Sequence, residues 1–293
     1  MSSHAHCHRH GHSHQHSTGS SVDRRHSHGH EHAHEHAHGG HSHGPDFSAL
    51  PTSPEEATKF FNEAAAGWEE KPGVKQLAAD VLASLQRHLP WDALRWPECT
   101  AMDFGAGVGM VSVPLAAKCR KVVALDSSEN MLKTLKARQA RERAEQPQEE
   151  KKDDNIETIC MILDESSIHT LGNQRFDLIF ISMVAHHLAE LESTFQLLAS
   201  LLAPNGVLAV FDMEQNERTH LFHDPYAKKH AGVIADFGFT PAFMSQLFEK
   251  LGLHVNFCGS EFAIRKRVQP DENNPSTEEL DFNVLGVFGV RKP

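Results

Sequence analysis

The sequence lacks a surplus of basic residues, a signal peptide and any long uninterrupted apolar run. Its 28 lysines and arginines are outnumbered by 39 acidic residues, giving a formal net charge of −11, which argues against a broad nucleic-acid-binding surface. The N-terminus has no apolar stretch of the signal-peptide type. The longest uncharged run, 193–211, is broken by Pro204 and Gly206, which predicts a helix, a turn and a strand. We therefore expect no nucleic-acid or membrane partner.

Cysteine pairs are also missing. The five cysteines include no Cys-x-x-Cys pattern and are odd in number, which suggests a reducing compartment. Cys99 and Cys160 stand in apolar, strand-like segments, where we expect buried free thiols. These absences together favour a cytoplasmic protein, with the nucleus as the alternative.

Histidine, in contrast, is concentrated near the N-terminus. The first 44 residues hold 16 of the 24 histidines, mostly as His-x-His, and almost no large apolar side chain. Such a segment cannot offset the entropy of ordering, so we expect residues 1–46 to be disordered. Imidazoles are common ligands of zinc, nickel and copper, but fixed site spacing is absent. We predict diffuse, exchanging binding of divalent metal by residues such as His4, His6, Cys7 and His8, and no metal site in the core. A low-complexity tail without a metal role is the alternative.

The most informative segment is a glycine-rich loop between two apolar stretches. Gly105, Gly107 and Gly109 alternate with other residues, and the second apolar stretch ends on Asp126. Glycines let the backbone turn sharply and approach a ligand, and the helix that follows directs its positive end toward that ligand. An acid at the end of the next strand is placed to accept hydrogen bonds from a ribose. The segment predicts an adenosine-containing ligand, but Met110 replaces the third glycine of the dinucleotide fingerprint.

The pattern Asp-x-Gly-x-Gly-x-Gly over 103–109 resembles motif I of the class I S-adenosylmethionine (SAM) methyltransferases. Matching motifs follow in order at 126–132, 159–165, 176–188 and 202–212. The segment 60–72 is similar to the entry helix of small-molecule methyltransferases of the ubiquinone-biosynthesis type. The resemblance covers most of residues 55–292. It implies SAM as cofactor and the following cofactor-binding residues: Asp103, Gly105, Gly107, Gly109, Asp126, Met131, Asp164, Glu165 and Ser182.

Alternating strands and helices predict a parallel α/β sheet. The resemblance implies a Rossmann-like seven-stranded sheet with helices on both faces and an N-terminal helical cap. We expect a catalytic domain over 47–293, divided into N-terminal helices 55–89, a core 99–213, and a cap with a C-terminal hairpin over 214–293. The expected strands are 99–104, 121–126, 156–163, 176–183, 206–212, 253–263 and 281–291; the expected helices include 108–118, 128–143, 188–202 and 240–251.

Methyl transfer from a sulfonium requires alignment and exclusion of water, and a general base only when the acceptor must lose a proton. Histidine can take that proton near neutral pH. The candidate bases are His186, His187, His223 and His230, with a packing role as the alternative for each. Aromatic and polar residues over 214–239 favour an enclosed pocket for a small organic acceptor. We therefore predict a SAM-dependent methyltransferase acting on a small molecule. Two alternatives stay open: a zinc- or nickel-binding scaffold or buffering protein whose methyltransferase-like domain is catalytically idle, and a protein methyltransferase.

Overall fold

The computed structural model describes residues 54–89, 96–145, 154–269 and 276–293, and the predicted tail 1–46 lies outside these ranges. Its helices are α1 (Pro54–Ala64), α2 (Val74–His88), α3 (Ser112–Ala116), α4 (Glu129–Glu145), α5 (Leu191–Leu201), α6 (Pro225–His230) and α7 (Pro241–Lys250). Its strands are β1 (Thr100–Phe104), β2 (Lys121–Asp126), β3 (Ile156–Cys160), β4 (Phe176–Ser182), β5 (Leu202–Met213), β6 (Leu253–Val268) and β7 (Glu278–Arg291).

The strands form one seven-stranded sheet in the order β3-β2-β1-β4-β5-β7-β6. Strands β1 to β5 are parallel, whereas β7 runs antiparallel to both β5 and β6. The chain moves outward from β1 to β3 and then returns to β4, so the strand order reverses between β1 and β4. Ligands of open α/β sheets bind at such a point, beyond the carboxyl ends of the strands.

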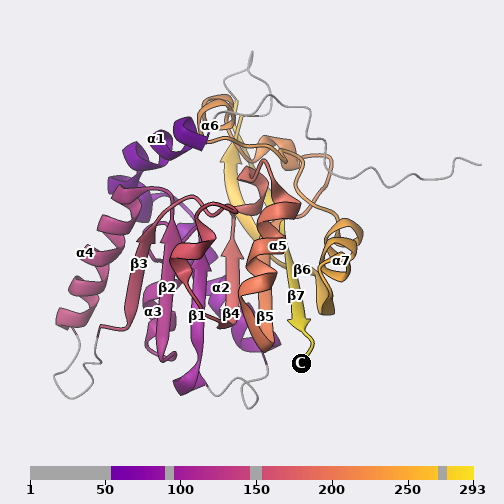
Figure 1. Ribbon diagram of the computed structural model, residues 1–293. Coiled ribbons are helices and arrows are strands. Elements are labelled where there is room, and N and C mark those ends of the chain that lie inside the picture. Colours follow the sequence, from indigo (N-terminus) through magenta and orange to yellow (C-terminus); the bar gives the residue numbers. More distant parts are fainter. Residues whose placement is uncertain (1–53, 90–95, 146–153, 270–275) are drawn as a thin grey trace, which may run out of the picture. The chain divides into compact units, whose positions relative to one another are not determined.

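Helices cover both faces of the sheet, as predicted, because its central strands are apolar on both sides. On one face, Ile179 and Ile181 of β4 pack with Phe195 of α5 and Phe248 of α7. On the other face, side chains of α2, α3 and α4 pack against the sheet: Val81, Leu85, Leu115, Leu132 and Leu135. Helices α5 and α7 lie in front of the sheet in Figure 1, and α1 and α6 lie beyond the carboxyl ends of β1, β2 and β4.

Several element boundaries differ from the predicted ones, and three of these differences have a local structural cause. The helix expected over 108–118 is only α3, because the glycine loop occupies the residues before it. The turn expected before β5 is a bulge inside the strand, where the register jumps from Leu202 to Val207 and Asn205 adopts a φ of 62°. Helix α5 begins at Leu191 rather than at 188, because a 3-10 turn occupies 185–187.

The two cysteine predictions have different outcomes. Cys99 is buried, as expected, but Cys160 is exposed. The prediction for Cys160 was wrong because β3 is an edge strand of the sheet and only its first residue, Ile156, is buried.

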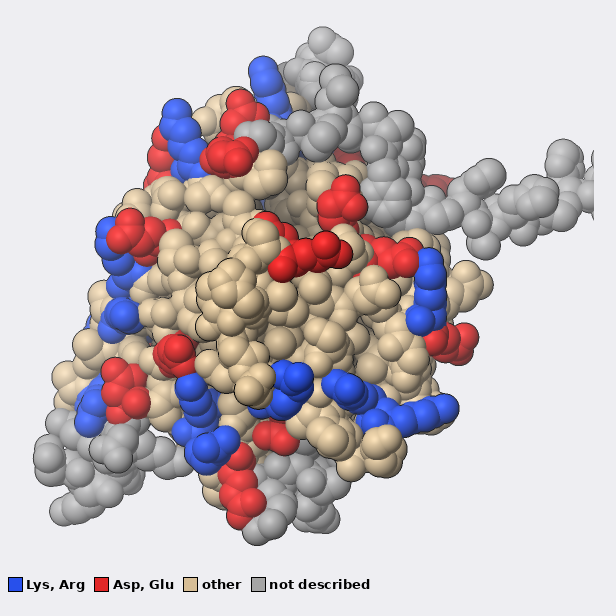
Figure 2. All heavy atoms as spheres, viewed as in Figure 1, with Lys and Arg blue, Asp and Glu red and all other residues tan. Residues whose placement is uncertain are grey.

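The described surface carries charges of both signs. On the face in Figure 2, basic and acidic side chains surround an uncharged centre, and no continuous basic stripe crosses the described part of this face. None of the helices within the described ranges has the length and apolar character needed to span a membrane.

Candidate active site

A cavity of about 530 Å³ lies at the point where the strand order reverses. The glycine loop after β1, the end of β2, the segment 161–165 and the end of β4 form its walls, and Phe61 and Trp68 from the N-terminal helices complete them. Eight of the nine predicted cofactor-binding residues line it: Asp103, Gly105, Gly107, Asp126, Met131, Asp164, Glu165 and Ser182. Gly109, the ninth, is not among the lining residues.

The three loop glycines have different structural roles. All three adopt positive φ, at +77° for Gly105, +52° for Gly107 and +75° for Gly109. A Cβ atom at Gly105 would overlap the side chain of Val184, and one at Gly109 would overlap Leu135. Gly107 has open space around its missing Cβ and lines the cavity. Gly105 and Gly109 therefore allow close packing, and Gly107 leaves room for a ligand.

Asp126 fixes the loop against the end of β2. Its Oδ2 accepts a hydrogen bond from the Gly107 amide at 2.8 Å, and its Oδ1 accepts one from the Ser128 amide at 2.8 Å. Burial raises the pKa of Asp126, and these two backbone donors oppose the shift. Each oxygen keeps a further lone pair, so the carboxylate can still accept hydrogen bonds from ligand hydroxyls.

Asp103 is a second carboxylate in the cavity wall, with only 3% of its surface exposed. Burial raises its pKa to about 7; a hydrogen bond from Ser112 Oγ, at 2.5 Å, opposes this shift, and the nearby Asp126 adds to it. A carboxylate that is desolvated and beside a like charge gains most from a cationic partner. This corner of the cavity therefore favours the positively charged part of a ligand.

Asp164 and Glu165 lie at the rim of the cavity. Asp164 holds the local turn, because its Oδ1 accepts hydrogen bonds from the amides of Ser166 and Ser167 at 2.8 Å each. The Ser166 hydroxyl and these amides keep the pKa of Asp164 below its usual value. Asp164 thus supports the loop, while Glu165 adds a second carboxylate near a ligand.

The four candidate bases occupy different positions. His187 lines the cavity. His186 lies behind it, 1% exposed, with its Nδ1 2.7 Å from Asp212 Oδ1. His223 packs beside both, with ring centroids 5.0 Å from His186 and 5.8 Å from His187. His230 lies in α6 against Tyr226 and, like His223, is absent from the cavity lining.

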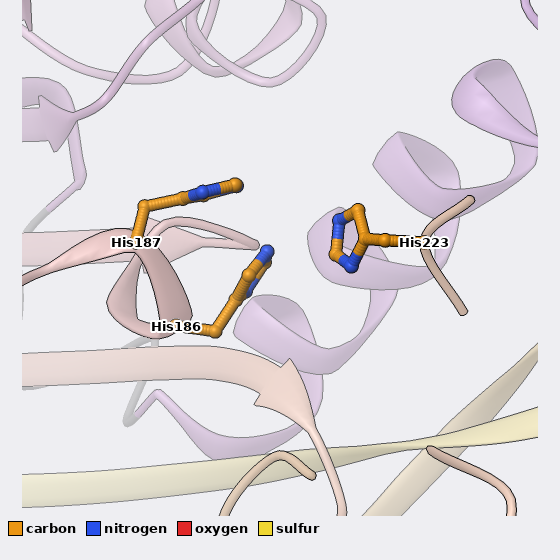
Figure 3. A group of neighbouring side chains, drawn as sticks. All are labelled: His186, His187 and His223. Carbon is orange, nitrogen blue, oxygen red and sulfur yellow. The ribbon is translucent and has the colours of Figure 1, made fainter. Parts of the chain in front are cut away.

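Burial lowers the pKa of both His187 and His223, and the neighbouring His186 contributes to the shift in each case. Both rings are therefore neutral at neutral pH, and neither is a strong base. The three-ring cluster lies between the end of β4 and the segment after β5 (Figure 3).

Asp212 was not among the predicted site residues. It is 1% exposed and also accepts a hydrogen bond from the Met213 amide at 2.7 Å. The signal that could have identified it is an acid near the carboxyl end of β5, the strand adjacent to the one that leads into the His-His pair. Met183 was also missed; it lines the cavity with a φ of 57°, a strained conformation for a residue other than glycine.

Comparison with known proteins gives matches to methyltransferases. The family model described as a methyltransferase domain matches residues 102–208. An uncharacterized methyltransferase of Schizosaccharomyces pombe is 29% identical over 164 residues, which cover 52% of this chain and 52% of that protein. The match therefore spans about half the length of this curated relative.

Two solved structures share the fold. A Haloferax volcanii protein, solved in complex with the Trm112 methyltransferase activator, has a TM-score of 0.58 at 16% identity, covering 80% of this chain and 98% of its own. Magnesium protoporphyrin IX methyltransferase of Synechocystis, solved with bound SAM, has a TM-score of 0.50 at 18% identity, covering 84% of this chain and 99% of its own.

Proposed function

We propose that this chain is a class I methyltransferase, as its methyltransferase-domain match over 102–208 supports, and that it transfers the methyl group of SAM to a small-molecule acceptor. The observation that carries the proposal is a pair of carboxylates, the buried Asp103 and the half-buried Asp126, that line one cavity beside the glycine loop. Asp103 suits a cation and Asp126 suits a diol, and SAM has both groups.

The residues that line the cavity would each hold one part of the cofactor. Asp103 would pair with its ammonium group, and Asp126 would accept hydrogen bonds from its ribose hydroxyls. Met131 and Glu165 would border the adenine ring, and Ser182 and His187 would border the sulfonium. All of these side chains line the cavity.

The acceptor occupies the part of the cavity beside His187. Phe61, Trp68 and Leu188 line the same cavity, so it offers an apolar surface for an organic molecule. Helix α1 contributes to the wall, which supports an enclosed small-molecule site over an open peptide groove.

When bound, SAM supplies an electrophilic methyl group. The chain's contribution is alignment and exclusion of water. The His187 ring is partly buried and neutral and lines the cavity, so it can contact and orient the acceptor. Its lowered pKa makes it a poor general base, which favours acceptors that lose their proton readily.

Calorimetric titration of the full chain with SAM, S-adenosylhomocysteine and NAD tests the cofactor. We expect micromolar binding of the first two and none of NAD. Asp126→Ala and Gly107→Arg should abolish binding in a folded protein, whereas Glu145→Ala, at the exposed end of α4, should not. Equal binding by all variants would show that the site is wrongly assigned.

The acceptor class needs a separate experiment. The chain is incubated with methyl-labelled SAM and either the small-molecule fraction or the macromolecular fraction of a cell extract. Label in small molecules supports the proposal, and label only in protein supports a protein methyltransferase. SAM binding without transfer to either fraction would favour the idle-domain alternative.

A further inference from the structure

We propose that His186, His187 and His223 form a binding site for a divalent transition metal, with zinc as the best match, beside the proposed methyl-transfer cavity. One ring nitrogen from each histidine lies within 4.8 Å of those of the other two. In Figure 3 the three rings face one another, with two from the loop after β4 and one from the segment after β5. We expected no metal site in the core from the sequence, but the fold brings His223 to the other two histidines.

His186 has the environment of a metal ligand. A carboxylate accepts hydrogen bonds, so the contact of 2.7 Å between His186 Nδ1 and Asp212 Oδ1 places the ring proton on Nδ1. The lone pair is then on Nε2, which is buried and has no hydrogen-bond partner among the described residues. A histidine oriented by a carboxylate in this way is the usual outer arrangement of a metal-binding imidazole.

The other two histidines each have a buried ring nitrogen that also lacks a hydrogen-bond partner among the described residues. His187 Nδ1 and His223 Nδ1 are each buried without a hydrogen bond inside the described ranges. An unsatisfied buried polar atom destabilises the fold, and three of them in adjacent rings call for a common explanation. A metal ion that accepts lone pairs from this cluster supplies one.

The ligand set narrows the choice of metal. The cluster contains imidazoles only, which suit zinc and neighbouring first-row metals and exclude calcium or magnesium as preferred ions. Tetrahedral zinc with bonds of about 2.0–2.1 Å holds its nitrogens roughly 3.4 Å apart. Nitrogens up to 4.8 Å apart therefore need to approach one another by up to about 1.4 Å, within the range of side-chain rotation.

Three protein ligands leave one tetrahedral position unfilled. Zinc sites with three histidines characteristically hold water or a substrate atom there. Because His187 also lines the cavity, a metal at this site would lie within reach of a molecule bound there. The site itself does not depend on the proposed methyl transfer.

The histidine-rich N-terminus complicates a direct metal titration, so the test compares full-length variants that all retain it. The wild-type chain, His223→Gln, His187→Gln and the control His254→Gln are titrated with Co²⁺ and followed by visible absorption; His254 is exposed on β6, outside the cluster. Circular dichroism checks folding. We expect the strong bands of four-coordinate cobalt in wild type and control, and their loss in the two cluster variants.

Thermal unfolding with Zn²⁺ gives an independent readout. At a free metal concentration 100-fold above Kd, the melting temperature of wild type and control should rise by about 5–10 °C, and that of the folded cluster variants should not. Asp212→Asn should weaken metal affinity about 10–100-fold. Identical cobalt spectra and zinc-induced shifts in cluster variants and control would overturn the proposal. SAM titration of the same proteins keeps this result separate from the cofactor assignment.

Discussion

The protonation state of Asp103 makes ligand binding in the cavity depend on pH. Its pKa of about 7 without a ligand results chiefly from burial, and only the ionised form attracts an ammonium group. A bound cation would lower that pKa, so binding below pH 7 must release a proton.

We therefore predict that SAM affinity falls up to tenfold for each unit of pH below about 7, and that Asp103→Asn binds weakly with little pH dependence. Calorimetry between pH 5.5 and 8, in buffers of different ionisation enthalpy, counts the released protons. A wild-type affinity that does not change with pH would contradict this role of Asp103.

Ionisation of Asp103 favours SAM binding, but it lowers the stability of the ligand-free fold. Its folded pKa of about 7 lies above 3.8, the ordinary pKa of an aspartate, so the folded state binds the proton more tightly. The resulting stabilisation is complete below about pH 4 and is lost as pH rises to 7, a change on the order of 4 kcal/mol. Urea unfolding of the ligand-free chain should show this decline, and Asp103→Asn should reduce it. An equal decline in both proteins would assign it to other groups.

Alanine substitutions at two glycines of the same loop should have different effects on stability and on SAM binding. Gly109→Ala combines a positive φ with overlap on Leu135, and we expect a loss of more than about 2 kcal/mol of stability. Gly107→Ala has a positive φ but open space, so it should cost about 1–2 kcal/mol while weakening SAM binding, because the new methyl group enters the cavity. Thermal unfolding and calorimetry of both variants separate the effects. Equal stability losses would contradict the packing role of Gly109.

At the scale of elements, α1 is held to the domain by polar contacts and by the partly buried ring of Phe61, which packs against Trp68. It has no buried residue, yet it contributes Phe61 to the cavity wall. Asn62 joins it to the start of α4: its Oδ1 accepts hydrogen bonds from Ser128 Oγ at 2.9 Å and from the Asn130 amide at 3.0 Å. A short helix without a buried face depends on such contacts.

We predict that Asn62→Ala weakens SAM binding about three- to tenfold and accelerates amide exchange over 54–64, with under about 1.5 kcal/mol lost from global stability. Glu63→Ala, on the exposed side of the same helix, is the control and should change neither. Unchanged exchange in Asn62→Ala would mean that other contacts hold the helix.

Local sequence patterns correctly predicted those helices and strands whose formation depends only on their own residues. The apolar stretches of β1, β2 and β4 and the helix α7 needed no tertiary information, and the seven-stranded fold class is confirmed. The bulge at 202–207 was missed because pairing with β4, and not the turn residues, extends the strand. The His186–Asp212 contact was missed because it depends on two strands becoming neighbours in the sheet. The assignment of the cofactor residues stays a prediction.

At the scale of the whole domain, Glu261 connects α2 to the C-terminal strands. It is the extra residue of a β-bulge, where Ser260 and Phe262 pair with consecutive residues of β7. Its side chain, 3% exposed, accepts hydrogen bonds from Ser84 at 2.6 Å and Arg87 at 2.8 Å, and lies 2.7 Å from His88 Nε2.

Glu261→Ala leaves Ser84 and His88 without this partner, so we expect a loss of about 2–3 kcal/mol in the free energy of unfolding. Arg87→Ala should cost less than about 1 kcal/mol, because 59% of the arginine side chain is exposed to solvent. Urea unfolding of both variants measures the difference. Equal losses would show that Glu261 does not anchor α2.

Strand β7 has a consequence for synthesis on the ribosome. It lies between β5 and β6, although both precede it in the chain. Until residues 278–291 leave the exit tunnel, β5 has no partner on one edge and the 16 residues of β6 have none in the sheet. Unpaired edges of this kind promote association between nascent chains. The domain therefore completes its sheet only after nearly all of it has been translated, and a chaperone that shields β5 and β6 would act in that interval.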